Sequence, residues 1–352
     1  MWTYWTMFCV PALASLSPWR LDRSSRLFML TVTAVLLILV IGFRDHVGMD
    51  WDGYANVLRE FETSSLGQIL VGKEPGFGFI NWLSGQFGWG LYAVNVFAAA
   101  IFVIGLLAFL LRQPNAWGCL ALAVPVLVIQ LGMSGIRQAC AVGFFCLAMN
   151  AFVDRRVFRY LGWALLAFSF HQTAIVLIPL AALIEGRSRA VLIFSVTVLI
   201  LLILAFAFKG FEFYNEAYIQ HDLGGAAGAI PRIAFNVMAA GLFFAFRKRW
   251  AAFYPDSRLF LVSAIMVIAI APFLPFTQVA VDRLEYYLIP FQIAVVSRIQ
   301  EFLPQRIRVA FMSIVFTGYA AALAVWLNYS WIAQLAWVPY RSILFGTPPS
   351  TL

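Results

Sequence analysis

The sequence predicts an all-α, polytopic membrane protein with about 12 transmembrane helices, and three observations support this fold class. Hydrophobic residues make up 63% of the 352 residues, 11% are charged, and the mean hydropathy is +0.87. A soluble domain is closer to half apolar and a quarter charged. Apolar runs near the length needed to cross a bilayer recur along the chain, and none alternates as a strand would. Because a chain in lipid must satisfy its own backbone hydrogen bonds, we expect helices within one integral membrane domain, residues 1–352.

The connections between the apolar segments alternate in charge. Every second connection along the chain belongs to one set, which holds 16 Lys and Arg against 5 Asp and Glu. The remaining connections hold 8 Lys and Arg against 11 Asp and Glu. By the positive-inside rule the first set is cytoplasmic and both termini lie outside. The net charge of +8 is therefore a topology signal and does not indicate nucleic-acid binding. The twelve segments are roughly 2–17, 27–43, 90–111, 117–133, 136–153, 157–170, 172–184, 190–208, 233–246, 259–275, 284–296 and 309–327.

Two outer connections, about 44–89 and 209–232, are long enough to shape a site. In the first, apolar residues at helical spacing predict an amphipathic helix over 54–70, lying at the interface. Pro75 to Phe79 then interrupts, and 80–87 is predicted as a short helix. The second connection carries a Gly/Ala run with a few charged residues, a composition expected of a mobile lid.

Ionisable side chains gather on the predicted outer side of the membrane. They include Arg44, Arg137, Arg232, Arg283, most of the acids and all three histidines. Charges at membrane depth are costly unless they are paired or face water, so each one is a functional hypothesis. Arg137 and His171 are the strongest candidates, because their short flanking loops hold them near the membrane.

Each of these residues also has a structural interpretation. Arg137 could snorkel to the interface or pair with an acid, and His171 could cap or pack. Arg44 and Asp50 could form a salt bridge within one loop. Four further residues fit a solvated loop: Asp52, Glu212, His221 and Asp222.

We predict no metal site and no cofactor. Asp50-Trp51-Asp52 mimics the Asp-x-Asp signature of enzymes that use nucleotide sugars, but those donors are cytoplasmic and this segment is predicted outside. Three histidines without repeated spacing do not make a zinc site. The four cysteines all fall inside apolar runs and are predicted to be small core residues: Cys9, Cys119, Cys140 and Cys146.

Several arginines with a few acids or histidines on one face suit phosphate chemistry. The planar fork of arginine binds phosphate oxygens in bidentate fashion and stays charged. A neighbouring Asp, Glu or His can accept a proton from an attacking hydroxyl. A lipid-linked diphospho-sugar is a natural ligand, and the lack of an ATP motif means that the substrate carries its own energy.

Four groups of residues resemble motifs of one family, in the same order. They are Phe43-Arg44-x-x-Val47-Gly48-x-Asp50-x-x-x-Tyr54; Glu74-x-Gly76-Phe77; Ile136-Arg137-Gln138-x-x-Ala141 followed by Phe170-His171-Gln172-Thr173-Ala174; and Asp282-Arg283 through Tyr286 or Tyr287, with a terminal Val338-Pro339-Tyr340. At these residues the chain resembles the EpsG family of exopolysaccharide polymerases, relatives of the Wzy-type O-antigen polymerases. The resemblance spans residues 40–340.

The resemblance implies a GT-C-like membrane glycosyltransferase of the bacterial inner membrane, with its active site on the periplasmic loops. It would transfer a growing glycan from undecaprenyl diphosphate to the terminal sugar of another lipid-linked repeat unit, with inversion and without a metal. The expected partners are the lipid-linked oligosaccharide, the bilayer, and assembly proteins such as a flippase and a chain-length regulator.

The resemblance also suggests roles for individual residues. Arg137 and Arg283, assisted by Arg44 and Arg232, would hold the diphosphate. Asp50 is the first choice as base, with Glu74 and His171 as rivals. Further substrate contacts are expected from Tyr54, Gln138 and Tyr287.

Three other functions remain open. A lipid-linked oligosaccharide flippase or exporter would use the same arginines as a pathway, but would more often show pseudo-symmetric halves. An O-antigen-type ligase shares the donor and differs in its acceptor. A sugar acyltransferase would need a His/Asp pair and an inward-facing tunnel, and no histidine is predicted on the inner side.

Overall fold

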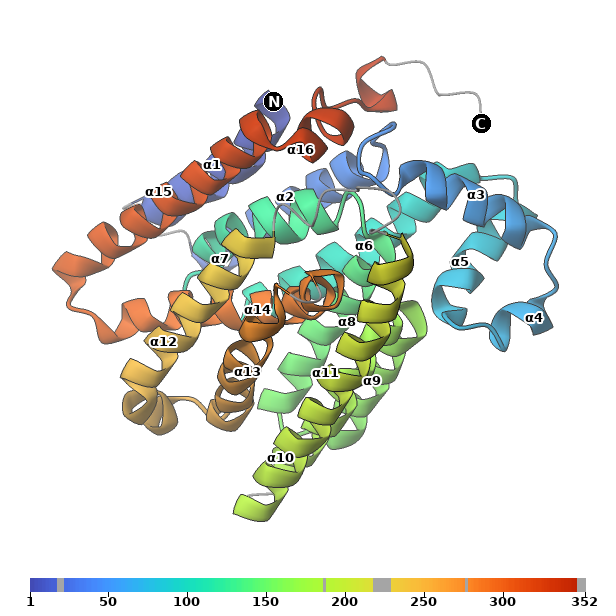
Figure 1. Cartoon of the computed structure of the whole chain (residues 1–352). Helices are drawn as coiled ribbons and strands as arrows, with labels where there is room; N and C mark the ends of the chain where they lie inside the picture. The colour runs from blue at the N-terminus through green and yellow to red at the C-terminus, as the bar shows by residue number, and fades with distance from the viewer. Residues whose placement is uncertain (18–21, 186–187, 218–228, 276–277, 347–352) are drawn as a thin grey trace.

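A computed structural model of the chain describes residues 1–17, 22–185, 188–217, 229–275 and 278–346. Over these residues the chain is helical, apart from turns and one isolated bridge between Arg44 and Ser342 (Figure 1). The helices are α1 Trp2–Leu16, α2 Arg23–Gly42, α3 Trp51–Glu62, α4 Leu66–Leu70, α5 Pro75–Gln86, α6 Gly90–Leu110, α7 Ala116–Ala123, η1 (π) Val124–Leu131, α8 Ile136–Val153, α9 Val157–Phe170, η2 (3₁₀) Gln172–Ala181, α10 Ala182–Glu185, α11 Arg189–Ala217, α12 Ala229–Phe253, α13 Ser257–Ile270, η3 (3₁₀) Ala271–Phe273, α14 Gln278–Phe302, α15 Gln305–Tyr329, α16 Trp331–Ala336 and η4 (3₁₀) Ile343–Phe345.

All twelve predicted apolar segments coincide with helical stretches. Among the described residues, five helices are long and apolar enough to cross a membrane: α2, α6, α8, α12 from Ile230, and α15. The other apolar stretches are shorter. The all-helical membrane fold is therefore confirmed, while the count of twelve spans and the GT-C-like arrangement remain predictions.

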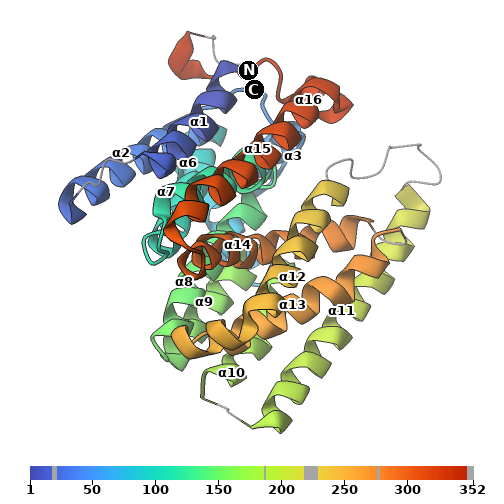
Figure 2. The ribbon, with the colours of Figure 1, turned by 90° about the vertical axis from the view of Figure 1, so that its left-hand side faces the viewer.

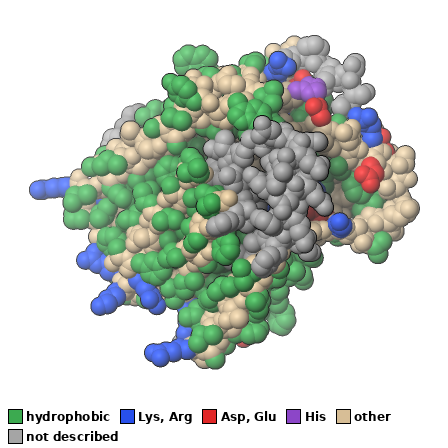
Figure 3. Space-filling model, viewed as in Figure 1, with side chains coloured by type: hydrophobic (Ala, Val, Ile, Leu, Met, Phe, Trp, Pro, Cys, Tyr) green, Lys and Arg blue, Asp and Glu red, His purple; other side chains and the backbone are tan. Residues whose placement is uncertain are grey.

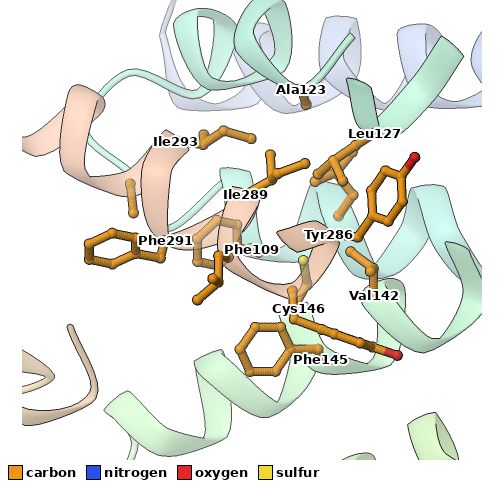
Figure 4. Close-up of a cluster of buried hydrophobic side chains, with 14 of the residues drawn as sticks. Phe109, Ala123, Leu127, Val142, Phe145, Cys146, Tyr286, Ile289, Phe291 and Ile293 are labelled. Carbon is orange, nitrogen blue, oxygen red and sulfur yellow. The ribbon is translucent and has the colours of Figure 1, made fainter. Parts of the chain in front are cut away.

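Helix α14 forms the centre of the core. Its side chains from Leu284 to Ile299 are almost all buried, and it packs on α7, α11, α12, α13 and α15 (Figure 2). Figure 4 shows Ile289 and Tyr286 of α14 beside Leu127 of η1 and Val142 of α8. Because this stretch of α14 is buried in the core, the polar residues that precede it, Asp282 and Arg283, lie at one end of the bundle. Three cysteines are fully buried, as predicted: Cys119, Cys140 and Cys146.

The two ends of the molecule differ in charge. In Figure 3, acidic side chains lie with a histidine and some Lys and Arg at the upper right, whereas the charged side chains that project at the left and lower left are mostly Lys and Arg. The pairs Arg112–Asp154 and Arg308–Glu301 come from connections that the sequence assigns to the inner side. This polarity agrees with the two sets of connections in the sequence.

The first long connection contains three helices rather than the predicted two. The single amphipathic helix over 54–70 is wrong, because Ser65 and Gln68 form a capping box that ends one helix and starts the next. The segment from Pro75 to Phe79 does not interrupt a helix either. It begins α5, since Pro at the first helical position loses no hydrogen bond there.

The second long connection is shorter than predicted. Helix α11 continues to Ala217 and α12 begins at Ala229, so part of the expected lid over 209–232 is helical. His221 and Asp222 lie outside the described residues. Asp282 and Arg283 precede the predicted apolar segment 284–296, and they lie in the first turns of α14.

The C-terminal segment packs on the start of the first connection. The amide of Gly48 donates to the Ala336 carbonyl at 2.8 Å, and the amide of Ile343 donates to the Phe43 carbonyl at 3.2 Å. The Tyr4 hydroxyl donates to the Trp337 carbonyl at 2.6 Å, which adds α1 to the same end. These contacts fix the backbone that leads to Asp50.

Candidate active site

A polar cavity of about 370 Å³ opens at the end of the molecule that carries the acids. Its walls come from the loop before α3, from the starts of α8, α12 and α14, from η1 and from the C-terminal segment. Seven of the ten residues predicted for the site line this cavity: Asp50, Tyr54, Arg137, Gln138, His171, Arg232 and Arg283.

Arg137 is the second residue of α8 and forms an ion pair with Glu74. The guanidinium Nη1 lies 2.7 Å from Glu74 Oε2, and its carbon lies 5.8 Å from the ring centres of Tyr54 and Phe77. Glu74 Oε1 also accepts from the amide of Gln172 at 3.3 Å. Glu74 thus connects α5, α8 and the turn that carries His171, which explains why residues so distant in sequence meet here.

Asp50 is exposed in the cavity and accepts a hydrogen bond from Ser134 Oγ at 3.1 Å. Gly48 sets its position. The backbone of Gly48 has φ +100° and lies against the carbonyl of Met133, where a Cβ would collide. The loop before α3 therefore lies against the turn between η1 and α8, and the Asp50 carboxylate faces the start of α8.

His171 lies in the connection between α9 and η2, and its ring is held by its neighbours. The Thr173 amide donates to Nδ1 at 3.3 Å, and Thr173 Oγ1 lies 2.7 Å from the same atom. An Nδ1 that accepts leaves the proton on Nε2. Burial, with the Arg283 and Arg137 charges nearby, lowers the pKa of His171 to about 3, so the imidazole is neutral at physiological pH.

Arg232, in the first turns of α12, is buried between acids of α14. It donates to Asp282 Oδ1 and to Gln130 Oε1, the latter at 2.7 Å, and its Nε lies 3.7 Å from Glu285 Oε2. Glu285 is fully buried, and among the described residues neither of its carboxyl oxygens has a hydrogen-bond donor. Arg232 is thus paired with Asp282, and the Glu285 carboxyl group lies one helical turn further along α14.

Arg283 is exposed in the cavity. Among the described residues its guanidinium has no acidic partner within ion-pair distance, unlike those of Arg137 and Arg232. Its backbone carbonyl accepts from Nε2 of the buried Gln138, a contact that ties α14 to α8. This arginine is therefore the cavity cation most available to an anionic ligand.

Three predicted residues lie outside the cavity wall. Glu74 lies behind Arg137, as described. Arg44 is fully buried, and its guanidinium donates to the carbonyls of Ile41 and Val47 and to Asn95 at 2.6 to 3.1 Å. It thereby satisfies one carbonyl in the last turn of α2 and one in the loop that follows, which is a structural role. Tyr287 is also buried, with its hydroxyl 3.2 Å from Thr173 Oγ1, and Tyr286 lines the cavity in its place.

Sequence reasoning missed several cavity residues. Glu285, which lies behind the cavity wall, could have been predicted. It follows Asp282 by three positions, so on a helix the two acids lie on the same face. The others carry no signal that distinguishes them from interfacial residues: Gln130, Ser134, Trp326 and Trp337. Within the described part of the chain, no group of three or more His, Cys, Asp and Glu is arranged to hold a metal ion.

Comparison with known proteins agrees with the motifs. The sequence model of the EpsG family matches residues 27–342, which include every described residue of the cavity. No curated protein and no solved structure matches the chain. Because the match covers nearly the whole chain, the protein belongs to the EpsG family, a family of membrane-bound exopolysaccharide polymerases.

Proposed function

We propose that the protein transfers a growing glycan from undecaprenyl diphosphate to the terminal sugar of another lipid-linked repeat unit, at the periplasmic face. The observation that carries the proposal is the cavity itself. Arg283, which has no acidic partner in the described part of the chain, and the exposed carboxylate of Asp50 line the same polar space. The pair supplies what glycosyl transfer from a diphosphate needs: a cation for the leaving group and a base for the attacking hydroxyl.

The leaving diphosphate would be held first by Arg283. Arg137 would add a second contact, since one guanidinium can serve Glu74 and a phosphate together. Arg232 is already paired with Asp282, so it would contribute by orientation rather than by net charge. As the anomeric bond breaks, negative charge grows on the diphosphate, and fixed cations stabilise that transition state without reorganisation.

Asp50 is the best placed of the three candidate bases. The ion pair with Arg137 occupies Glu74, and His171 with a pKa of about 3 is a weak proton acceptor at neutral pH. Asp50 would take the proton of the acceptor hydroxyl as that oxygen attacks the anomeric carbon. The bond to the diphosphate then breaks on the opposite face, so a single displacement inverts the configuration, and no step requires a metal.

The test uses purified protein in proteoliposomes with lipid-linked repeat units, and no nucleotide or metal. A ladder of polymer with release of undecaprenyl diphosphate would support the proposal. Movement of labelled lipid-linked units across the bilayer without a ladder would instead identify an exporter. Transfer to a lipid A core but not to another repeat unit would identify a ligase.

A further inference from the structure

A second cavity, of about 440 Å³, adjoins the polar one and has a different character. It lies between the beginning of α12, the C-terminal half of α15 and η1, and most of its wall is apolar. Phe235 of α12 stacks on Tyr319 of α15 at its base, with ring centres 4.5 Å apart. We call this space the α12–α15 groove.

The groove is continuous with the polar cavity. Gln130, Arg232 and Trp326 line both spaces, and Arg232 donates to Gln130 at their junction. Trp326 packs edge-on against Trp337 on the polar side, with ring centres 5.2 Å apart. One molecule could therefore place a polar group among the arginines and an apolar chain in the groove.

The groove is also open toward the surroundings. Val325 and Tyr329 line it and are 58% and 84% exposed. Helices α12 and α15 both meet the length and hydropathy of membrane spans, so an opening between them would face lipid if both cross the bilayer. A ligand could enter from the bilayer without its apolar part crossing water.

These features fit a ligand that is amphiphilic, with an anionic head and a long apolar chain. We propose that the α12–α15 groove binds the isoprenoid tail of the lipid-linked donor, an inference that rests on the proposed function. Because lipid is as apolar as the groove, binding gains little from the hydrophobic effect. Its role is orientation: a tail fixed in the groove directs the diphosphate past Arg232 toward Arg283.

The test is photocrosslinking of the full-length protein in nanodiscs. The probe is a polyprenyl diphosphate with a diazirine in the isoprene units nearest the phosphates. Labelled peptides should map to 231–235 and 319–329, and excess undecaprenyl diphosphate should suppress them. Labelling elsewhere, or equal suppression by phosphatidylglycerol, would overturn the proposal, the latter because the groove would then bind any lipid.

Two substitutions on α15 provide matched variants. Val325→Trp should fill the groove and reduce crosslinking at least fivefold. Val309→Trp alters an equally exposed valine, 59% against 58%, that does not line the groove, and it should leave labelling unchanged. The two positions lie roughly 160° apart around the helix. Equal labelling of both variants would contradict the assignment.

Crosslinking requires no glycan transfer, so the two proposals can fail separately. A wild-type protein that is labelled as expected but makes no polymer would refute the proposed function alone. A protein that polymerises while the probe labels other helices would refute the groove alone.

Discussion

At the scale of single residues, two carboxylates two positions apart have opposite environments. Asp50 lines the cavity and bonds to Ser134, whereas the Asp52 side chain is 85% exposed and lies 3.5 Å from Nδ1 of His46. The Asp-x-Asp pattern could indicate that both carboxylates bind one metal ion. At the start of α3, however, the two side chains point in different directions. This separation allows the base to be tested with a control beside it.

Asp50→Asn should lower the polymerisation rate by about 10²- to 10⁴-fold, because the amide cannot accept the hydroxyl proton. Asp52→Asn should keep the rate within about twofold. Initial rates of ladder formation on the reconstituted proteins measure both. If Asp50→Asn retained the wild-type rate while Glu74→Gln abolished it, the base would be Glu74.

His171 offers a test through pH. Its pKa is lower in the folded protein, about 3, than the ordinary 6.5, so folding favours the neutral ring. The resulting contribution to stability is complete above pH 6.5 and is lost as the pH falls toward 3. Between pH 7.5 and 5 the loss is about 2 kcal/mol. His171→Gln should remove it, so its melting temperature should fall less over this range than that of the wild type. Parallel curves would contradict the buried neutral imidazole.

At the scale of elements, the close approach of α5 to α9 holds the ion pair of the site. A Cβ at Gly76 would lie 2.6 Å from the ring of Phe170 and from Ser169 Oγ. Glu74, two residues earlier, joins Arg137 to the amide of Gln172. Glycine at position 76 therefore determines where the start of α5 meets the turn with His171.

Gly76→Ala should push α5 away from α9 and destabilise the protein by about 1 to 3 kcal/mol, with a lower polymerisation rate. Gly53→Ala is the matched control, since a Cβ on this glycine of α3 meets nothing within 4 Å. Thermal unfolding in detergent measures both. Equal melting temperatures for the two variants would show that α5 does not depend on this contact.

Sequence patterns predicted elements better than their boundaries. Long apolar runs identify helices because their hydrophobicity is decisive over many residues. The break between α3 and α4 depends on one capping box, and the start of α5 depends on a proline that also fits an interruption. More than one local backbone structure is compatible with such short signals, and packing in the folded protein selects one of them.

For the candidate site too, the sequence predicts which residues matter better than how they are arranged. Arginines and acids on one side of the membrane could be recognised because charge at membrane depth is rare. Their pairing could not be predicted, since Arg232 of α12 and Asp282 of α14 are 50 residues apart in the sequence and meet only because α12 packs on α14. The charge of Arg44 predicts substrate binding, yet its guanidinium is buried and donates to the carbonyls of Ile41 and Val47.

At the scale of the whole molecule, the proposed reaction requires the end with the cavity to face outward. Asp52 lies at the end with the cavity, and Arg306 begins α15 at the opposite end. Both are exposed, whereas three of the four native cysteines are fully buried. In a Cys9→Ser background, Asp52→Cys should react with an impermeant maleimide added to intact spheroplasts. Arg306→Cys should react only after permeabilisation, and the reverse pattern would place the cavity in the cytoplasm.

In the proposed reaction, the cavity arginines stabilise a departing diphosphate. The most direct measurement is release of undecaprenyl diphosphate per repeat unit added, by purified wild type, Arg283→Ala, Arg283→Lys and Arg59→Ala. Arg59 is an exposed control on α3 that bonds to Asn56. We predict one release per unit for wild type and Arg59→Ala, at least a 100-fold slower release for Arg283→Ala, and poor recovery with Lys, whose ammonium lacks the bidentate fork. Wild-type release from folded Arg283→Ala would contradict the account.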